Sequence, residues 1–166
     1  MIDIQNIHQN NWAQTQISIL GGGRSGIAAA KLGQYWGSKI FISDKNNSQK
    51  IMENIRDYNY EAGKHSEKVL EADLIIISPG IPCSIPIVQK CLEQNIPIVS
   101  EIEFASWFTA SPILALTGSN GKTTTVNLLH EMCMNDGKTS LLGGNVGMPF
   151  SENVLFELNS NISNSV

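Results

Sequence analysis

Two glycine-rich stretches of the sequence have the residue types and spacing that bind phosphate groups. The second of them, TGSNGKTT at residues 117–124, follows an apolar run and precedes a stretch with helical spacing. Glycines let backbone N–H groups converge on phosphate oxygens, a helix start adds a favourable dipole, and the Lys122 ammonium adds a full charge. The hydroxyl of Thr123 is in the position that binds Mg²⁺ in loops of this kind. The sequence therefore predicts a site for nucleotide phosphates and a metal ion.

The first stretch, GGGRSG at residues 21–26, fits the dinucleotide-binding pattern GxGxxG through Gly21, Gly23 and Gly26. Asp44 ends the next β-rich segment, about twenty residues later, where an acid would bind a ribose hydroxyl. Taken alone, this pattern favours NAD. Two plainer interpretations stay open, because Asp44 could be an acid that only ends a strand and Arg24 could be a solvated cation.

The second stretch lacks the leading glycine of the common pattern GxxxxGK[ST], since Leu116 stands at that position. With this departure it resembles the ATP loop of the Mur ligases, which add amino acids to the peptidoglycan precursor and whose loop reads TG[ST]NGK[ST]. GGNVGMP at residues 143–149 resembles a second motif of that family. SPGIP at 78–82 and SEIE at 100–103 resemble its D-glutamate-adding branch. The resemblance spans residues 17–149 and consists of several motifs in the family's order.

This resemblance implies two nucleotide sites. ATP and Mg²⁺ would bind at the second loop, with Lys122 as the catalytic cation, Thr123 as a metal ligand, and as the whole ATP site Gly118, Ser119, Asn120, Gly121, Lys122, Thr123 and Thr124. The resemblance also implies a site for UDP-N-acetylmuramoyl-L-alanine, made of Gly23, Arg24, Ser25 and Gly26 near the diphosphate, Asp44 and Lys45 near the uridine, and Gly80 and Asn145.

The presence of both loops in one chain indicates which nucleotide the first stretch binds. A hydride-transferring enzyme gains nothing from an ATP loop ninety residues later, so the pair favours UDP over NAD. Asn145 keeps a plainer alternative, in which it only shapes a turn.

The elements that must position these loops alternate between strand and helix. Apolar β-rich runs predict strands at 17–20, 39–44, 74–77 and 96–100. Helical spacing predicts helices at 27–36, 51–58, from Pro86 onward and at 101–108. Alternation of this kind builds a parallel sheet with helices on both faces.

A second strand–loop–helix unit is predicted after the linker TASP at 109–112. Its strands are expected at 113–116 and about 139–142, and its helix at 124–135. We therefore expect an α/β fold, with a Rossmann-like parallel-sheet domain at residues 1–109. Residues 110–166 are expected to be the start of a P-loop ATP-binding α/β domain that is cut short.

Several side chains are expected to be structural. Trp36 and Trp107 are predicted core residues, whereas Trp12, in a polar segment, has no predicted place. Glu101 and Glu103 are predicted to lie on a solvated helix face. His8, His65 and His130 show no pattern of partners, and we expect them to be surface or packing residues.

The resemblance also indicates which parts of a ligase are not visible in the sequence. The family has a central-domain glutamate for Mg²⁺ in an ELSS-like segment, then a histidine, a modified lysine and a third domain for the incoming amino acid. ELNS at 157–160 follows GGNVGMP too closely and lacks the preceding apolar strand, so it is not expected to fill that role.

We therefore expect a truncated ligase without the D-glutamate site, inactive alone and monomeric in its full-length form. Unpaired strands predict that this chain is prone to self-association. Two rival classes remain open: a non-catalytic nucleotide-binding module and an NAD-dependent oxidoreductase.

Composition and charge limit the possible partners. The chain is 42% apolar and 16% charged, which is ordinary for a globular protein, and its net charge of -4 provides no general basic surface for nucleic acid. Three cysteines without a CxxC pair suggest reduced thiols. No signal peptide is visible, and the longest aliphatic run, residues 74–77, is far too short to cross a bilayer. We expect a cytoplasmic protein with neither nucleic acid nor membrane as a partner.

Overall fold

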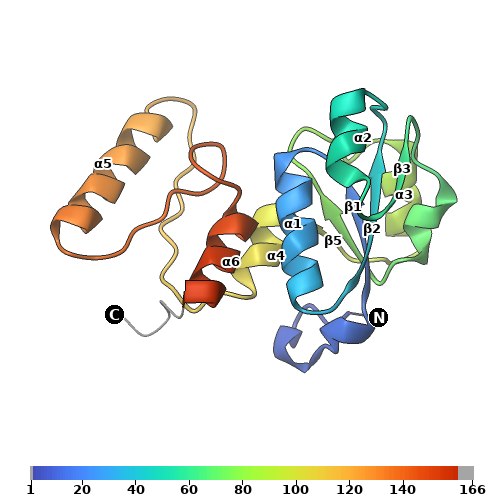
Figure 1. Ribbon diagram of the computed structural model, residues 1–166, viewed down its shortest axis with the longest axis horizontal. Coiled ribbons are helices and arrows are strands. Elements are labelled where there is room, and N and C mark those ends of the chain that lie inside the picture. Colours follow the sequence, from blue (N-terminus) through green and yellow to red (C-terminus); the bar gives the residue numbers. More distant parts are fainter. Residues whose placement is uncertain (1, 161–166) are drawn as a thin grey trace.

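The computed structural model describes residues 2–160, and it contains a five-stranded parallel sheet with helices on both faces (Figure 1). The strand order is β3-β2-β1-β4-β5. The strands are β1 (Gln16–Leu20), β2 (Lys39–Asp44), β3 (Asn59–Ala62), β4 (Leu74–Ile77) and β5 (Ile98–Ser100). The predicted α/β class and Rossmann-like parallel sheet are confirmed. Strand β3 was not predicted, because its sequence NYEA is polar and only half buried.

Within residues 2–160 the chain also forms six α-helices and three short 3-10 helices. The α-helices are α1 (Arg24–Tyr35), α2 (Gln49–Ile55), α3 (Pro86–Glu93), α4 (Glu101–Ser106), α5 (Lys122–Asn135) and α6 (Phe150–Ser160). The 3-10 helices are η1 (Ile7–Gln9), η2 (Trp12–Gln14) and η3 (Glu67–Glu71). Below, "sheet unit" means residues 2–109 and "phosphate-loop segment" means residues 110–149.

Strand β1 is central and separates two hydrophobic clusters. Ile17 and Ile19 lie in the cluster beneath α1, α4 and α6, whereas Leu20 lies in the cluster with Val88 and Cys91 of α3. Side chains alternate between the faces of a strand, and helices cover both, so every residue from Ile17 to Leu20 is fully buried. The carboxyl end of β1 is thereby held rigidly next to the first glycine stretch.

An aromatic cluster closes the lower end of the sheet unit, gives Trp12 its place and corrects the prediction for Trp36. Trp12 is only 8% exposed, with its ring within about 6 Å of Phe104, Trp107 and Phe108. Trp107 packs against the core as predicted. Trp36 is 39% exposed and stacks on Phe108, so its prediction as a core residue was wrong. It lies just after the end of α1, where its ring contacts Tyr35 and Phe108 and remains partly in solvent.

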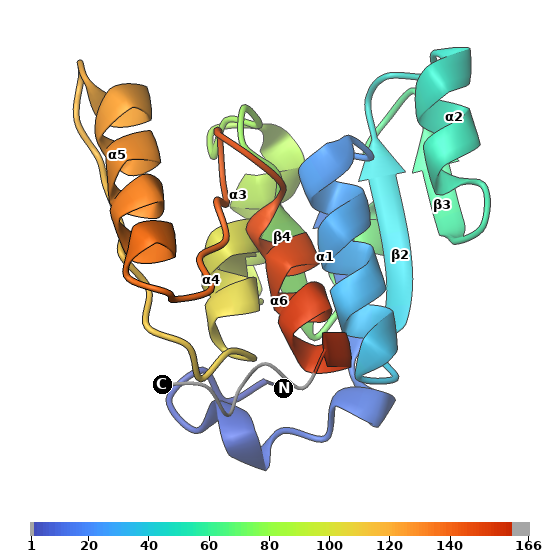
Figure 2. The same ribbon diagram turned by 60° about the vertical axis from the view of Figure 1, so that its left-hand side comes forward.

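Helix α6 packs on α1 and α4, as both views show (Figures 1 and 2). Val154 is 1% exposed in the core, and Leu155 and Leu158 pack beside it. No helix was predicted here, because the polar residues around these apolar positions obscure their spacing. The chain therefore returns to the sheet unit after the phosphate-loop segment.

The phosphate-loop segment is extended on both sides of α5 and contains no regular strand in the described structure. The strands predicted at 113–116 and 139–142 are absent there, and the closest feature is one isolated bridge between Gly143 and Met148. Apolar runs form strands only when a neighbouring strand accepts their hydrogen bonds, and none lies beside these runs. Helix α5 consequently has no buried residue.

No helix within residues 2–160 combines the length and apolar character that a bilayer span requires.

Candidate nucleotide site

The first glycine stretch forms the turn between β1 and α1, at the carboxyl edge of the sheet. Gly21 has a φ of +101°, and its amide donates to the Ser43 carbonyl at 2.9 Å. Within residues 2–160, the amide N–H groups of Gly23, Arg24 and Ser25 have no acceptor, and no side chain caps the start of α1. Unpaired amides at a helix start are the geometry that binds anions.

Two of the glycines in this turn have different surroundings. A Cβ on Gly26 would lie 1.9 Å from the Gly21 carbonyl oxygen, so the fold itself requires glycine there. Gly23 has a φ of -77°, and a Cβ on it would meet nothing within 4 Å. The fold does not require glycine at position 23, which instead leaves the turn's backbone open to a ligand.

Asp44 lies at the end of β2 and holds the glycine turn. Its Oδ2 accepts from the Gly22 amide at 2.6 Å, and its Oδ1 accepts from the Asn46 amide at 2.7 Å. The sequence is compatible with two roles for Asp44, a ribose contact or an acid that only ends a strand. The structure shows the carboxylate bonded within the chain, beside the turn where the ribose contact was expected. Lys45, the next residue, is exposed.

The segment after β4 reaches the same turn from the other side. The Ser78 hydroxyl donates to the Gly21 carbonyl at 3.3 Å, and Gly80, with a φ of +92°, is exposed two residues later. The turn therefore lies between the carboxyl ends of β1, β2 and β4. Because β2 and β4 lie on opposite sides of β1, this is the topological switch point where open α/β sheets bind ligands.

The second glycine stretch forms an open loop at the start of α5. Gly118 and Gly121 have φ values of +145° and +76°, and a Cβ on either would meet nothing within 4 Å. Within the described chain, the amides of residues 119–124 have no acceptor. The Lys122 ammonium donates to the carbonyls of Gly118 and Ser119 and so lies over the loop. These features fit a phosphate group, as the sequence predicts.

A metal ion would find fewer ligands. Thr123 is exposed at the start of α5 beside Lys122. Among residues 2–160, no cluster of three or more His, Cys, Asp or Glu side chains could hold a metal ion. Mg²⁺ commonly takes part of its coordination from substrate phosphates and water, so a single Thr123 hydroxyl fits a nucleotide-bound ion.

Arg24 connects the first glycine turn with the segment that carries Asn145. Its Nη2 donates to the Gly147 carbonyl at 3.4 Å. Gly144 and Met148 close a tight loop by a 3.0 Å backbone hydrogen bond, with Asn145 exposed between them. Figure 2 shows the glycine turn, this loop and the phosphate loop on one side of the molecule, the side toward which β2 points. The structure therefore brings Asn145 toward Arg24, whereas the phosphate loop is a separate segment on the same side.

A polar cluster that the sequence did not predict lies behind Asp44. The buried Ser43 hydroxyl lies 2.7 Å from both Glu61 Oε1 and His65 Nδ1. Burial lowers the pKa of His65, against the opposing effect of the carboxylates of Asp44 and Glu61. Burial would raise the pKa of Glu61, but hydrogen bonds from Ser66 and Ser43 lower it overall. These hydrogen bonds hold the end of β2 in place. The only sign of the cluster in the sequence is the serine next to Asp44. The His8 side chain lies outside the described residues.

Glu101 was wrongly predicted to be solvated, whereas Glu103 is exposed as expected. The Glu101 side chain is 2% exposed and accepts from the Ser151 amide at the start of α6. Spacing along α4 could not reveal this, because the partner lies fifty residues later.

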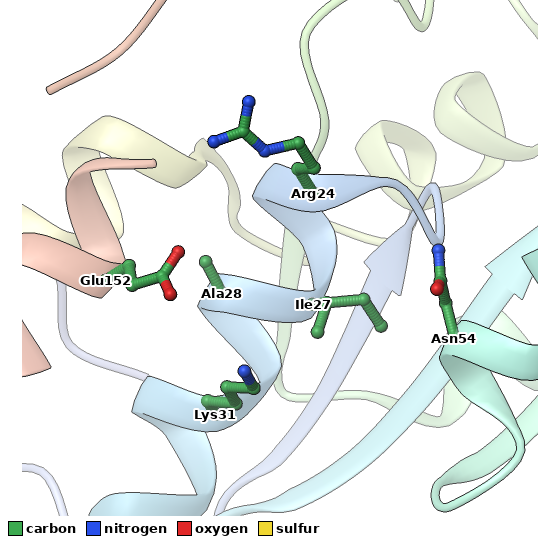
Figure 3. A pocket seen from close by; sticks show the side chains of 6 residues that line it. All are labelled: Arg24, Ile27, Ala28, Lys31, Asn54 and Glu152. Atoms are coloured by element: carbon green, nitrogen blue, oxygen red, sulfur yellow. The ribbon is translucent and has the colours of Figure 1, made fainter. Parts of the chain in front are cut away.

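A shallow pocket of about 180 Å³ lies on the outer side of α1, between α2 and α6. Figure 3 shows Glu152 pointing from α6 toward α1, with Arg24 and Lys31 of α1 above and below it. The pocket lies beside the glycine turn, because Arg24, the first residue of α1, lines it. Its charges are mixed, so it does not by itself define an anion site.

Comparison with known proteins identifies the family. The sequence profile described as "Mur ligase MurD-like, N-terminal domain" matches residues 15–100, which is more than half of the chain and includes β1 to β5. The chain belongs to the MurD-like Mur ligases. The resemblance found in the motifs is thereby confirmed.

Curated MurD-like relatives extend the match beyond the sheet unit. A UDP-N-acetylmuramoylalanine–D-glutamate ligase of Christiangramia forsetii is 42% identical over 148 residues, covering 86% of this chain and 33% of the relative. One from Chlorobaculum tepidum is 42% identical over 144 residues, covering 82% and 31%. The chain thus spans about a third of the length of the curated relatives it matches.

Solved structures support the fold. A UDP-N-acetylmuramate-alanine ligase from Thermotoga maritima superposes with a TM-score of 0.52 at 23% identity, covering 79% of this chain and 32% of that one. A murein peptide ligase from Psychrobacter arcticus gives 0.51 at 21% identity, covering 75% and 27%. At these identities the structural likeness is evidence for the fold and for nothing beyond it.

Proposed function

We propose that this chain forms the substrate-binding part of an ATP-dependent ligase that adds D-glutamate to UDP-N-acetylmuramoyl-L-alanine in the cytoplasm. One observation carries the proposal: two glycine turns with unpaired amides, each at a helix start, lie on the same side of the molecule. The identity of about 42% to ligases with this name supports the choice of substrate.

The two turns divide the substrates between them. Gly23, Arg24 and Ser25 would bind the UDP diphosphate through unpaired amides and the guanidinium, with Asp44 and Lys45 beside the uridine. Gly80 and Asn145 would contact the same substrate from the neighbouring loops. Ser119 to Thr124 would bind the ATP phosphates. The D-glutamate site is proposed to lie outside this chain.

The proposed reaction is amide formation through an acyl phosphate. The γ-phosphoryl group of ATP passes to the carboxylate of the L-alanine, and ADP leaves. The D-glutamate amine then attacks the acyl carbon, the amide bond forms with loss of a proton, and inorganic phosphate leaves. Lys122 would stabilise the charge on the transferred group from its place over the loop, and a Mg²⁺ ion at Thr123 would add further neutralising charge.

Calorimetry with UDP, ATP plus Mg²⁺, and NAD tests the proposal on the 166-residue chain. We expect UDP and ATP to bind, each without displacing the other, and NAD not to bind. Lys122→Ala should weaken ATP binding and leave UDP binding unchanged. Tight NAD binding without a response to UDP would support the oxidoreductase alternative instead.

The non-catalytic alternative requires a different measurement. Mixed with all three substrates, this chain alone is expected to release no phosphate in a D-glutamate-dependent manner, because the D-glutamate site is proposed to lie elsewhere. Adding a polypeptide that supplies the remainder of a MurD-like ligase should restore phosphate release. Failure of every such mixture, with both nucleotides bound, would favour the binding module.

A further inference from the structure

Helix α6 begins at Phe150, directly after the loop that carries Asn145. The first backbone N–H groups of a helix have no partner within the helix and need an acceptor from outside. Pro149, the residue before α6, has no side-chain acceptor, although its carbonyl accepts from the amides of Glu152 and Asn153. The amide of Ser151 therefore needs an acceptor from another part of the chain.

Glu101 supplies this acceptor from α4. Its Oε1 accepts from the Ser151 amide at 2.5 Å, and both residues are almost completely buried, at 2% and 0% exposure. A buried carboxylate is costly unless it is hydrogen-bonded, and a negative charge is favourable at a helix start. Glu101 therefore bonds the amino-terminal end of α6, where the helix dipole stabilises a negative charge.

The start of α6 in turn determines where the Asn145 loop lies. Asn153, in the first turn of α6, donates from Nδ2 to the Leu142 carbonyl at 2.8 Å, at the base of the loop. At the other end of the loop, Arg24 donates to the Gly147 carbonyl at 3.4 Å. Glu101 provides a buried hydrogen bond between the sheet unit and the start of the helix that holds this loop.

We propose that Glu101 is a positioning residue for the substrate. It bonds the start of α6 to the sheet unit, and so holds Asn145 beside the glycine turn, where the part of the substrate beyond the UDP group would lie. This proposal rests on the proposed function for the identity of the ligand. It extends that function by separating binding of UDP, which depends on the glycine turn and the end of β2, from binding of the sugar–peptide, which also needs the Asn145 loop.

Hydrogen exchange of the free 166-residue chain provides the first test, because it needs no ligand. Glu101→Gln keeps an acceptor but loses the charge, and we expect residues 143–153 to exchange about two- to thirtyfold faster. Glu101→Ala should exceed that effect, while residues 16–20 in β1 exchange at the wild-type rate. Glu103→Gln, the same change on the exposed side of α4, is the matched control and should change nothing. Wild-type exchange at 143–153 in both Glu101 variants would overturn the proposal, and so would equal acceleration throughout the sheet.

Calorimetry with two ligands provides the second test. Glu101→Gln should leave the Kd for UDP within twofold and raise the Kd for UDP-N-acetylmuramoyl-L-alanine at least about fivefold. Equal weakening of both ligands, or of neither, would overturn the substrate role. If the wild-type chain binds neither ligand, the proposed function and this substrate role both fail, while the exchange result still decides whether Glu101 holds the loop.

Discussion

Gly23 and Gly26 are three residues apart in one turn, and the structure gives different reasons for glycine at each. A Cβ on Gly26 would overlap the Gly21 carbonyl oxygen, whereas the space beside Gly23 is open. Gly26→Ala should lower the free energy of unfolding by about 1–3 kcal/mol, since the new methyl group overlaps backbone that cannot yield easily. Gly23→Ala should leave that energy within about 0.5 kcal/mol and raise the Kd for UDP tenfold or more. Urea unfolding and calorimetry measure the two effects separately.

One result for Gly23→Ala would contradict the proposed diphosphate site. If Gly23→Ala binds UDP as tightly as the wild-type chain does, no ligand approaches that backbone and the diphosphate site is elsewhere. Gly26→Ala is the control for a purely structural effect, because its methyl group clashes within the protein.

The His65 cluster predicts a pH dependence of stability. Burial lowers the pKa of His65 in the folded state, with a contribution from Lys45, against the opposing carboxylates of Asp44 and Glu61. The unfolded chain therefore takes up this proton first as the pH falls below about 6.5, and stability is lost from there down to the folded-state pKa. Between pH 7 and pH 5.5, Tm should fall less in His65→Asn than in the wild-type chain.

A control histidine separates this effect from general acid sensitivity. His130 on α5 lies outside this cluster, with its Nδ1 3.0 Å from the Ser140 hydroxyl oxygen, and His130→Asn is the matched histidine variant against which the Tm slope of His65→Asn is compared. Parallel slopes for His65→Asn and wild type would show that His65 does not titrate differently in the folded state.

Sequence patterns predicted the residue types of the candidate site better than their partners. Gly23, Arg24 and Asp44 lie near the ends of β1 and β2. The β–turn–helix unit that places them there can be recognised from local spacing alone. Local spacing carried no sign that Asp44 bonds Gly22 and Asn46, or that Glu101 bonds Ser151. These are long-range or tight-turn contacts, and they depend on how the elements pack.

At the scale of elements, strands were predicted well where β-branched runs lie between neighbours. Leu74 to Ile77 forms β4 between β1 and β5, as expected from a continuous apolar run in a parallel sheet. The similar run at residues 113–116 forms no strand, because no described strand lies beside it to complete the hydrogen bonds. Composition specifies a preference for strand, and the presence of a partner decides whether the strand forms.

Helix α6 is attached to the sheet unit at its far end by a second buried carboxylate. Glu157 is 8% exposed and accepts from the hydroxyls of Thr109 at 2.5 Å and Ser111 at 2.9 Å. Thr109→Val keeps the side-chain volume but removes one of these bonds to a charged group, so we expect a loss of about 1.5–3 kcal/mol in urea unfolding.

Two further variants make that measurement specific. Thr125→Val changes an exposed threonine on α5 and should cost little, and Thr109→Ser should retain most of the stability by keeping the hydroxyl. If Thr109→Val is no worse than Thr125→Val, Glu157 does not depend on this contact, and α6 is held by apolar packing alone.

At the scale of the whole molecule, burial is unevenly distributed. The sheet unit and α6 share one large core, whereas α5 stands apart from them in both views (Figures 1 and 2). The phosphate-loop segment exposes large apolar side chains: Ile113, Leu114, Leu116, Leu128, Met132, Met134 and Leu141. An open groove of about 570 Å³, lined in part by Leu129, Met132 and Cys133, lies at the carboxyl-terminal end of α5. Exposed apolar area on this scale is characteristic of surfaces that associate.

We therefore expect the 166-residue chain to self-associate through the phosphate-loop segment as its concentration rises. Light scattering should show a weight-average mass that increases with concentration. Leu114→Lys combined with Leu128→Lys should lower it toward the monomer, because two buried charges would oppose association. Leu92→Lys, at a residue 52% exposed on α3 of the sheet unit, should have no such effect. A chain that stays monomeric at high concentration would contradict this prediction. It would show that these exposed apolar side chains are tolerated in water without a partner surface.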